Sequence, residues 1–164
     1  MLIFRTLIIC VPLLLAGIVA SAQGANVAFG SIKADPSLPV EVTADNLDVN
    51  QASGSAEFVG NVLVGQGEMR LSANRVLVIY NQDVGGIDRL EATGDVVLVS
   101  GPDAAEAQRA DYTIDTGVVV MTGDVLLTQG PNALTSERMV VNLTDGTAQM
   151  TGRVKTIINP DSQN

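Results

Sequence analysis

The sequence predicts an all-β protein built from four repeats, each with the pattern of a β-hairpin. From Val40 onward apolar and polar residues alternate, with many β-branched types, as is typical of strands that bury one face. Short segments rich in Gly, Asn and Asp separate these stretches and favour turns. A phrase in which Gly, a polar residue and Val follow one another recurs four times. No stretch has convincing helical spacing of its apolar residues.

The first residues have the pattern of a secretory signal peptide. Arg5 supplies a positive charge, and residues 7–19 form an almost unbroken apolar run. This run is shorter than the roughly 20 residues that a transmembrane helix needs. Ala20-Ser21-Ala22 then provides the small residues that precede a cleavage site. We therefore expect residues 1–22 to be removed after Ala22, and the remaining chain to act outside the cytoplasm.

The composition of the remaining chain limits its partners. Loss of Arg5 changes the net charge from −9 to −10, because residues 1–22 contain no acidic residue. Nucleic-acid binding draws its affinity from Lys and Arg on phosphates, and anionic membrane surfaces also attract basic segments. The acidic excess argues against both. We expect other proteins or apolar ligands as partners and no nucleic acid.

The same composition argues against catalysis. The chain has no His, and its single cysteine, Cys10, lies within the leader. These are the side chains on which nucleophilic and acid–base chemistry most often depends. Three pairs of carboxylates remain, and we interpret them as solvated or turn residues. The pairs are Asp45/Asp48, Asp83/Asp88 and Asp111/Asp115. We predict that the protein is not an enzyme and has no metal site and no cofactor.

The chain divides into a lead-in, one domain and a short tail. Residues 23–39 have no sustained alternation and contain two prolines and two glycines, so we expect a flexible lead-in. The alternative is a short edge strand at Val27–Ile32. The predicted domain covers residues 40–158, and residues 159–164 form the tail.

The repeat consists of two elements that alternate along the chain. The glycines of the first element are 34, 29 and 29 residues apart. Its copies are Val59-Gly60-Asn61-Val62, Thr93-Gly94-Asp95-Val96, Thr122-Gly123-Asp124-Val125 and Thr151-Gly152-Arg153-Val154. The second element places apolar residues around an Ala or Ser that is followed by a polar residue. It runs through Val42–Val49, Leu71–Val78 and Leu134–Val141, with a looser copy around Ala107, Tyr112 and Ile114. Such a regular pattern indicates one structural unit repeated four times.

Residues at positions i and i+2 of a strand share one face, so the two elements together predict a repeated apolar face. Most of its residues are Val, Leu and Met, with one Phe and one Tyr. The predicted members are Leu47, Val49, Phe58, Val62, Val64, Val76, Val78, Leu98, Tyr112, Ile114, Leu127, Met139 and Val141. The face fits either a closed core or a groove for an apolar ligand.

Turn sequences between the elements favour antiparallel pairing. They are Ser53-Gly54, Gly85-Gly86, Asp115-Thr116-Gly117, Gly130-Pro131-Asn132 and Asp145-Gly146. Asp-Gly between alternating stretches is typical of a two-residue type I′ hairpin turn. We therefore predict at least eight antiparallel strands. A right-handed parallel solenoid with about 29 residues per coil is the competing architecture, and the hairpin turns argue against it.

With these residues identified, the sequence resembles the periplasmic lipopolysaccharide-transport protein A family (LptA, the OstA-like domain). The resemblance covers about Val40 to Ile158. It rests on the phrases Ala44–Val49, Phe58–Val64, Leu71–Val76, Ala92–Val96 and Thr122–Val125. The leader, and a sequence that ends soon after Pro160, favour the free-standing periplasmic carrier over related domains of its membrane-bound neighbours. The acidic net charge departs from this resemblance, because contacts to the phosphates of lipid A require basic side chains.

The resemblance implies a twisted β-jellyroll, V-shaped in section, whose apolar face binds the acyl chains of lipopolysaccharide. It also implies an inner-membrane transport complex as partner at the N-terminal edge and an outer-membrane translocon at the C-terminal edge, in outer-membrane assembly. An open sheet leaves unpaired edges that recruit other strands, so head-to-tail self-association follows. The edge contacts are expected at Val40, Val42, Val154, Thr156 and Ile158. The alternative is an exported β-repeat scaffold, structural or adhesive, that binds only protein.

Overall fold

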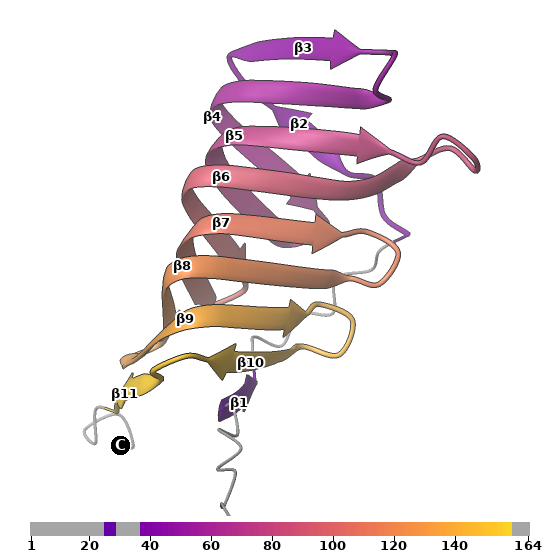
Figure 1. Ribbon diagram of the computed structural model, residues 1–164. Helices are drawn as coiled ribbons and strands as arrows, with labels where there is room; N and C mark the ends of the chain where they lie inside the picture. Colours follow the sequence, from indigo (N-terminus) through magenta and orange to yellow (C-terminus); the bar gives the residue numbers. More distant parts are fainter. Residues whose placement is uncertain (1–24, 29–36, 159–164) are drawn as a thin grey trace, which may run out of the picture.

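The computed structural model describes residues 25–28 and 37–158, and within them every regular element is a β-strand (Figure 1). The described ranges contain no helix with the length and apolar character that crossing a membrane requires. The strands are β1 (Ala25–Ala28), β2 (Glu41–Thr43), β3 (Asn46–Asn50), β4 (Ser55–Gln66), β5 (Met69–Tyr80), β6 (Ile87–Ser100), β7 (Asp103–Thr113), β8 (Val118–Gln129), β9 (Asn132–Asn142), β10 (Thr147–Thr151) and β11 (Lys155–Ile157).

All strands belong to one antiparallel sheet. Its order is β1-β10-β9-β8-β7-β6-β5-β4-β2, with β3 also paired to β4 and β11 also paired to β9. Every neighbouring pair is antiparallel, which confirms the all-β prediction and excludes the parallel solenoid. Consecutive strands are neighbours along most of the sheet, so local turns determine most of its topology.

The long strands are bent at one place, and this crease divides the sheet into two arms. Between β4 and β5, Val59 lies opposite Arg75 and Val62 opposite Ala73, so one extra residue enters β4 at the crease. The same shift recurs in the next four strand pairs. Arm A contains β3, the first half of β4 and their equivalents as far as β10. Arm B contains β2, the second half of β4 and their equivalents as far as β11. In Figure 1 the two arms cross obliquely.

The crease explains the sequence repeat. Gly60, Gly94, Gly123 and Gly152 all have positive φ, and so does the non-glycine residue that follows each one. Asn and Asp, which follow three of the four glycines, tolerate this left-handed conformation better than most residues. Two consecutive left-handed residues form a bulge that bends the strand sharply. The first repeat element is therefore the bend of every second strand.

The second repeat element supplies the side chain that pairs with each bend. Asn61 donates to Asp45 (Nδ2–Oδ2, 2.8 Å), and Asn74 donates to Asp95 (2.9 Å). Gln108 donates to Asp124 at 2.7 Å. In the fourth unit this polar pair is Arg153 and Glu137, at 3.6 Å. The two elements of the repeat therefore meet as a row of polar pairs along the crease.

The turns differ between the arms. In arm B, two-residue turns at residues 67–68, 101–102 and 130–131 join the strands, each beginning with a glycine of positive φ, as in type II′ hairpins. In arm A the loops are longer. The prediction of a two-residue turn at Asp145-Gly146 is wrong, because Asn142 pairs with Thr147 and the loop has four residues. There the Asn142 side chain accepts hydrogen bonds from the backbone N–H groups of Thr144 and Asp145.

The prediction that residues 23–39 form a flexible lead-in is wrong at its start. Residues Ala25–Ala28 form β1, which pairs with β10, with Ala25 opposite Met150 and Ala28 opposite Thr147. The alternative edge strand at Val27–Ile32 overlaps β1 only in its first two residues. A strand this short carries too little alternation to be recognised in sequence, and the β10 backbone is what stabilises it. The predicted leader and the predicted tail lie outside the described residues.

Candidate functional site: the apolar interior

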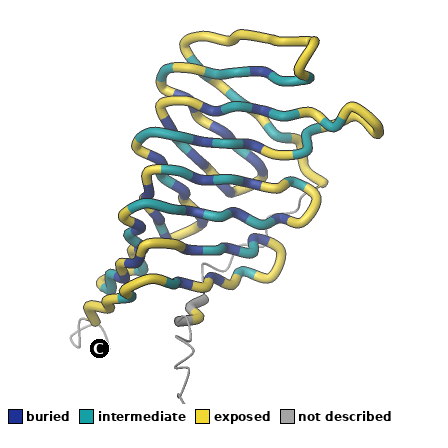
Figure 2. The backbone as a smooth tube through the Cα atoms, in the orientation of Figure 1, coloured by how far each residue is buried: buried dark blue, intermediate teal, exposed yellow. Residues whose placement is uncertain are grey.

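The two arms pack face to face and enclose an interior made almost entirely of aliphatic side chains. Residues from every strand between β4 and β10 contribute, and they alternate with partly buried or exposed residues (Figure 2). Examples are Val62, Leu98, Met121 and Leu127, all 1% exposed or less. The interior therefore extends along the whole sheet, with hydrophobic burial as its main stabilising force.

Most predicted members of the apolar face are in this interior. The buried ones are Val62, Val64, Val76, Val78, Leu98, Tyr112, Leu127, Met139 and Val141. Phe58 and Ile114 are partly buried and pack against the same core. Leu47 and Val49 are 54% and 65% exposed. They lie opposite Phe58 and Ala56, and they are exposed because β3, among the described strands, is an edge strand with a neighbour on one side only.

Several interior residues were not among the predicted members. Strand β7 contributes Ala105, Ala107 and Ala110, whose small side chains and helix-forming tendency hid the alternation. Met69 and Leu90 also belong to the core. Cross-strand position identifies them, because Leu90 lies opposite Tyr112 and Val78 in the neighbouring strands. In the sequence itself, the alternation within β5 and β6 is the signal that could have identified Met69 and Leu90.

A few polar groups lie within the interior near the hairpin ends of arm B. Tyr112 of arm A donates from its hydroxyl to the Gln66 Oε1 of arm B, and Gln66 Nε2 donates to the Leu38 carbonyl at 2.9 Å. Burial raises the pKa of Tyr112 to about 12. Among the described residues, the Ser100 hydroxyl is buried without a hydrogen-bond partner. A buried hydroxyl without a partner lowers the free energy of unfolding by about 1–3 kcal/mol, so the interior is not optimised for stability at that point.

The predicted edge-contact residues lie at both ends of the sheet. Val42 is in β2 opposite Val64, and Val40 precedes that strand; both pack partly against the core. Thr156 is in β11 opposite Leu134, while Val154 and Ile158 flank the strand. At the C-terminal end, however, arm A terminates in β10, and β1 covers that edge. The prediction of an open C-terminal edge therefore applies to arm B and not to arm A.

The outer face is polar and carries most of the charge. Arg109 donates to Glu91 at 2.9 Å and also pairs with Asp111, while Arg89 donates to Glu91 at 3.0 Å. These hydrogen bonds, first from Arg109 and then from Arg89, hold the pKa of Glu91 below its usual value. Exposed pairs of this kind contribute little stability. These ion pairs involve Arg89 and Arg109, two of the nine basic residues of the sequence. The described residues contain no cluster of three or more His, Cys, Asp or Glu that could hold a metal ion.

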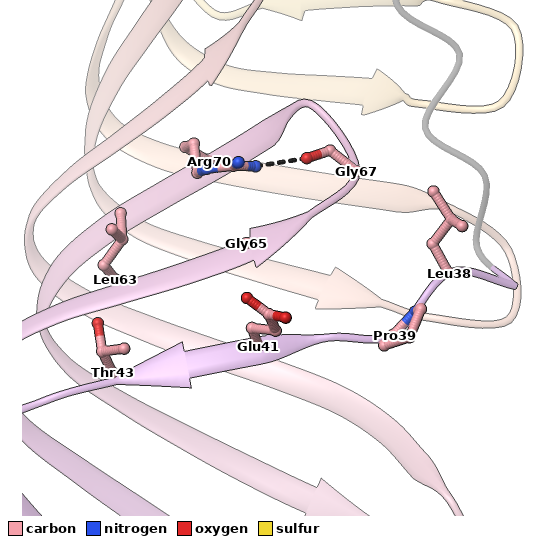
Figure 3. A pocket seen from close by; sticks show the side chains of 8 residues that line it. All are labelled: Leu38, Pro39, Glu41, Thr43, Leu63, Gly65, Gly67 and Arg70. Carbon is pink, nitrogen blue, oxygen red and sulfur yellow. Dashed lines mark hydrogen bonds between the residues drawn. The ribbon is translucent and has the colours of Figure 1, made fainter.

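A hollow of about 290 Å³ lies on the outer side of arm B at its N-terminal end (Figure 3). Leu63 of β4, Glu41 and Thr43 of β2 and Arg70 of β5 line it. Arg70 donates to the Gly67 carbonyl at 2.6 Å, which orients its guanidinium along the turn. Leu63 has the opposite orientation to Val62 and Val64, so this hollow is separate from the apolar interior.

These features define a class of protein, a creased antiparallel β-jellyroll with an aliphatic interior along its length and strand edges at both ends. Comparison with known proteins identifies the family. The chain belongs to the LptA/(LptD N-terminal domain) LPS transport protein family, whose pattern matches residues 41–147. This family is described as one of lipopolysaccharide transport proteins.

Two individual proteins are similar to this chain. An uncharacterized protein of Rhizobium meliloti (strain 1021) is 28% identical over 109 residues, which are 62% of this chain and 59% of that protein's length. LptH of Pseudomonas aeruginosa is described as the LptA-homologous periplasmic component of the conserved lipopolysaccharide transport device. Its crystal structure superposes with a TM-score of 0.69 and 19% identity, covering 77% of this chain and 99% of LptH. This similarity shows that the two proteins share a fold.

Proposed function

We propose that this protein is a periplasmic carrier that binds lipopolysaccharide by its acyl chains in the apolar interior. The observation that carries the proposal is the interior itself, which is aliphatic from β4 to β10 and contains few polar groups. Acyl chains need burial but no directional recognition, so Val, Leu and Met form a suitable lining. Membership of a lipopolysaccharide transport family supports the same ligand.

The energy of acyl exposure shows why a carrier is needed. Each methylene group exposed to water costs about 0.8 kcal/mol, so one chain of twelve carbons costs on the order of 10 kcal/mol. A lipid with several chains cannot cross an aqueous compartment at a useful rate without cover. An interior that extends along the whole sheet lowers this cost at every step of the path.

Binding requires the two arms to move apart, because side chains fill the interior in the described structure. The crease is the natural hinge, since every long strand bends there. At the opposite side, contacts between the arms include the Tyr112–Gln66 hydrogen bond. Opening therefore breaks few polar interactions, and acyl chains replace the apolar contacts that are lost.

The two ends of the sheet support a role as a bridge. In the part of the chain that the structure describes, β2 and β3 form the N-terminal edges, and β11 forms the edge at the C-terminal end of arm B. Exposed strand edges pair readily with other strands. We propose that the N-terminal edges meet an inner-membrane partner and the C-terminal edges an outer-membrane partner. Because the two ends differ, copies of the chain add head to tail between them.

Site-specific photo-crosslinking in cells tests the path of the lipid. A crosslinker at Val64, Val78 or Ile114, on the interior face, should capture lipopolysaccharide. The matched controls are the preceding residues Leu63, Leu77 and Thr113, which have the opposite orientation on the same segments. These should capture much less.

Equal capture at the interior and control positions would contradict the assignment of the interior as the lipid path. Mass spectrometry of the purified protein provides a second measurement. Co-purified lipopolysaccharide supports the carrier, whereas a protein that binds only protein and captures no lipid at any position would favour the scaffold.

A further inference from the structure

Strand β1 occupies a sheet edge that belongs to the opposite end of the domain. Its four residues pair with β10, from Ala25 opposite Met150 to Ala28 opposite Thr147. The next described strand, β2, lies at the other end of the sheet order. The chain thus uses its own N-terminal strand to cover the C-terminal edge of arm A (Figure 1).

The direction of β1 is the same as that of β3. Arm A runs β3-β4-β5-β6-β7-β8-β9-β10-β1, and every neighbouring pair is antiparallel. Directions therefore alternate, and β3 and β10 run oppositely. If a second copy continued arm A, its β3 would lie next to β10 and run as β1 does. Strand β1 therefore stands where β3 of the next copy would pair.

The strand lengths at the two ends also match. In arm A, β3 and β10 each have five residues, and in arm B, β2 and β11 each have three. Strands β2 and β11 run in opposite directions as well, so both arms can continue across a junction between copies. Among the described strands, β1 covers the C-terminal end of arm A, whereas β11 of arm B pairs with β9 alone.

Exposed apolar residues lie at the end that would dock. Leu47 and Val49 of β3 are more than half exposed in the single chain. Their cross-strand partners in β4 face the interior, as do Ala148 and Met150 of β10, which are buried. Pairing of β3 with the β10 edge of another copy would place these residues side by side and continue the apolar interior.

From these observations we propose that the β10 edge is an exchange site at which β1 of the same chain competes with β3 of a second copy. This inference rests on the head-to-tail association proposed above. In the single chain, β1 covers the edge and prevents uncontrolled growth. A second copy docks first on the β11 edge of arm B, which no described strand covers, and then displaces β1 from arm A.

A reversible disulfide between β1 and β10 tests the competition. The chain without residues 1–22 has no cysteine, so Val27→Cys with Ala148→Cys introduces the only pair. These residues lie opposite each other, and opposite residues of antiparallel strands have Cα separations that a disulfide can span. The matched control is Val97→Cys with Glu106→Cys, an opposite pair in β6 and β7, away from both ends.

Sedimentation velocity over a range of protein concentrations measures the effect. The oxidised Val27–Ala148 variant should need at least about tenfold more protein to associate than its reduced form, since locking removes the competent fraction. Deletion of residues 25–28 should shift association to lower concentration. The oxidised and reduced forms of the control variant should associate at the same protein concentration. Equal association of the oxidised and reduced lock would overturn the proposal.

Hydrogen exchange separates this inference from the proposed function. In dilute, monomeric protein the β10 amides should lose protection when residues 25–28 are deleted. Unchanged protection would show that β1 does not cover the edge, whatever the lipid result. If the β10 amides lose protection but association does not increase, β1 covers the edge but does not compete with a second copy for it. Crosslinking of lipopolysaccharide at Val64 depends on neither outcome, so it reports on the carrier function alone.

Discussion

At the scale of single residues, the crease glycines combine two constraints. Gly123 has a φ of +84°, which non-glycine residues rarely adopt, and a Cβ built there would lie 2.9 Å from the Cβ of Gln108. The same proximity to the paired polar residue recurs at Gly60, Gly94 and Gly152. The glycine is therefore required both for the bend and for the side chain that packs beside it.

Replacement of Gly123 by valine should destabilise the fold. A β-branched residue is strained at this φ and clashes with Gln108, so we expect the free energy of unfolding to fall by about 2 kcal/mol or more. Chemical denaturation measures the change. The matched control is Gly65→Ala, where φ is not positive and the nearest neighbour, Arg70, lies 3.6 Å from the added Cβ. A Gly123 variant as stable as this control would show that the crease tolerates a side chain.

At the scale of elements, the structure joins β7 of arm A to β4 of arm B. The Tyr112 hydroxyl donates to Gln66 Oε1, and both side chains are buried. This hydrogen bond lies far from the crease, near the ends of both strands, and connects residues 46 positions apart in the chain. It therefore holds together the side of the jellyroll opposite the crease, where the proposed binding of a lipid requires the arms to separate.

The pH dependence of stability should reveal this buried tyrosine. An unfolded tyrosine loses its proton near pH 10, whereas burial raises the pKa of Tyr112 to about 12 in the fold. The folded state then binds more protons between these values. Its contribution to stability is complete below pH 10 and is lost as pH rises towards 12. Thermal unfolding between pH 8 and 12 should show this decline.

Tyr112→Phe should flatten the decline above pH 10 and, at neutral pH, lower the free energy of unfolding by about 1 kcal/mol through loss of the hydrogen bond. Tyr80→Phe is the matched control, because Tyr80 is exposed on arm A. If both variants keep the wild-type pH profile, the stability change at high pH does not come from Tyr112.

At the scale of the whole molecule, the sheet has two ends that expose different apolar residues. Leu47 and Val49 are exposed on β3 at one end, and Ile157 and Ile158 at the other. The single chain leaves Leu47 and Val49 exposed, whereas the proposed head-to-tail junction would bury them. Removing their apolar character should therefore affect assembly more than folding.

The double variant Leu47→Asp with Val49→Asp should keep its melting temperature within a few degrees, since both side chains are largely exposed. It should lose concentration-dependent association, because two charges would be buried at the junction without partners. Light scattering across a concentration series measures this. The control adds the same charge away from the ends, at Tyr80→Asp with Val84→Asp, where Val84 is 83% exposed. Association of the double variant like that of wild type would exclude β3 from the junction.

Much of this architecture could be predicted from the sequence because strand alternation and turn residues are local properties. Alternation identified the interior face correctly for Val64, Val78 and Met139, since neighbouring residues on a strand point to opposite sides except at the crease. The glycine repeat correctly indicated a special backbone position in every unit. Antiparallel pairing followed from turns between successive strands. Each of these features depends on residues only a few positions apart.

The tertiary structure decided what depends on residues far apart in the chain. The polar pairs along the crease, such as Gln108 with Asp124, require the register between neighbouring strands. The exposure of Leu47 follows from the position of β3 at an edge, although its alternation matches that of buried residues. The pairing of β1 with β10 joins segments more than 100 residues apart. A four-residue strand has almost no pattern of its own, so only the free hydrogen-bonding groups of β10 determine where it pairs.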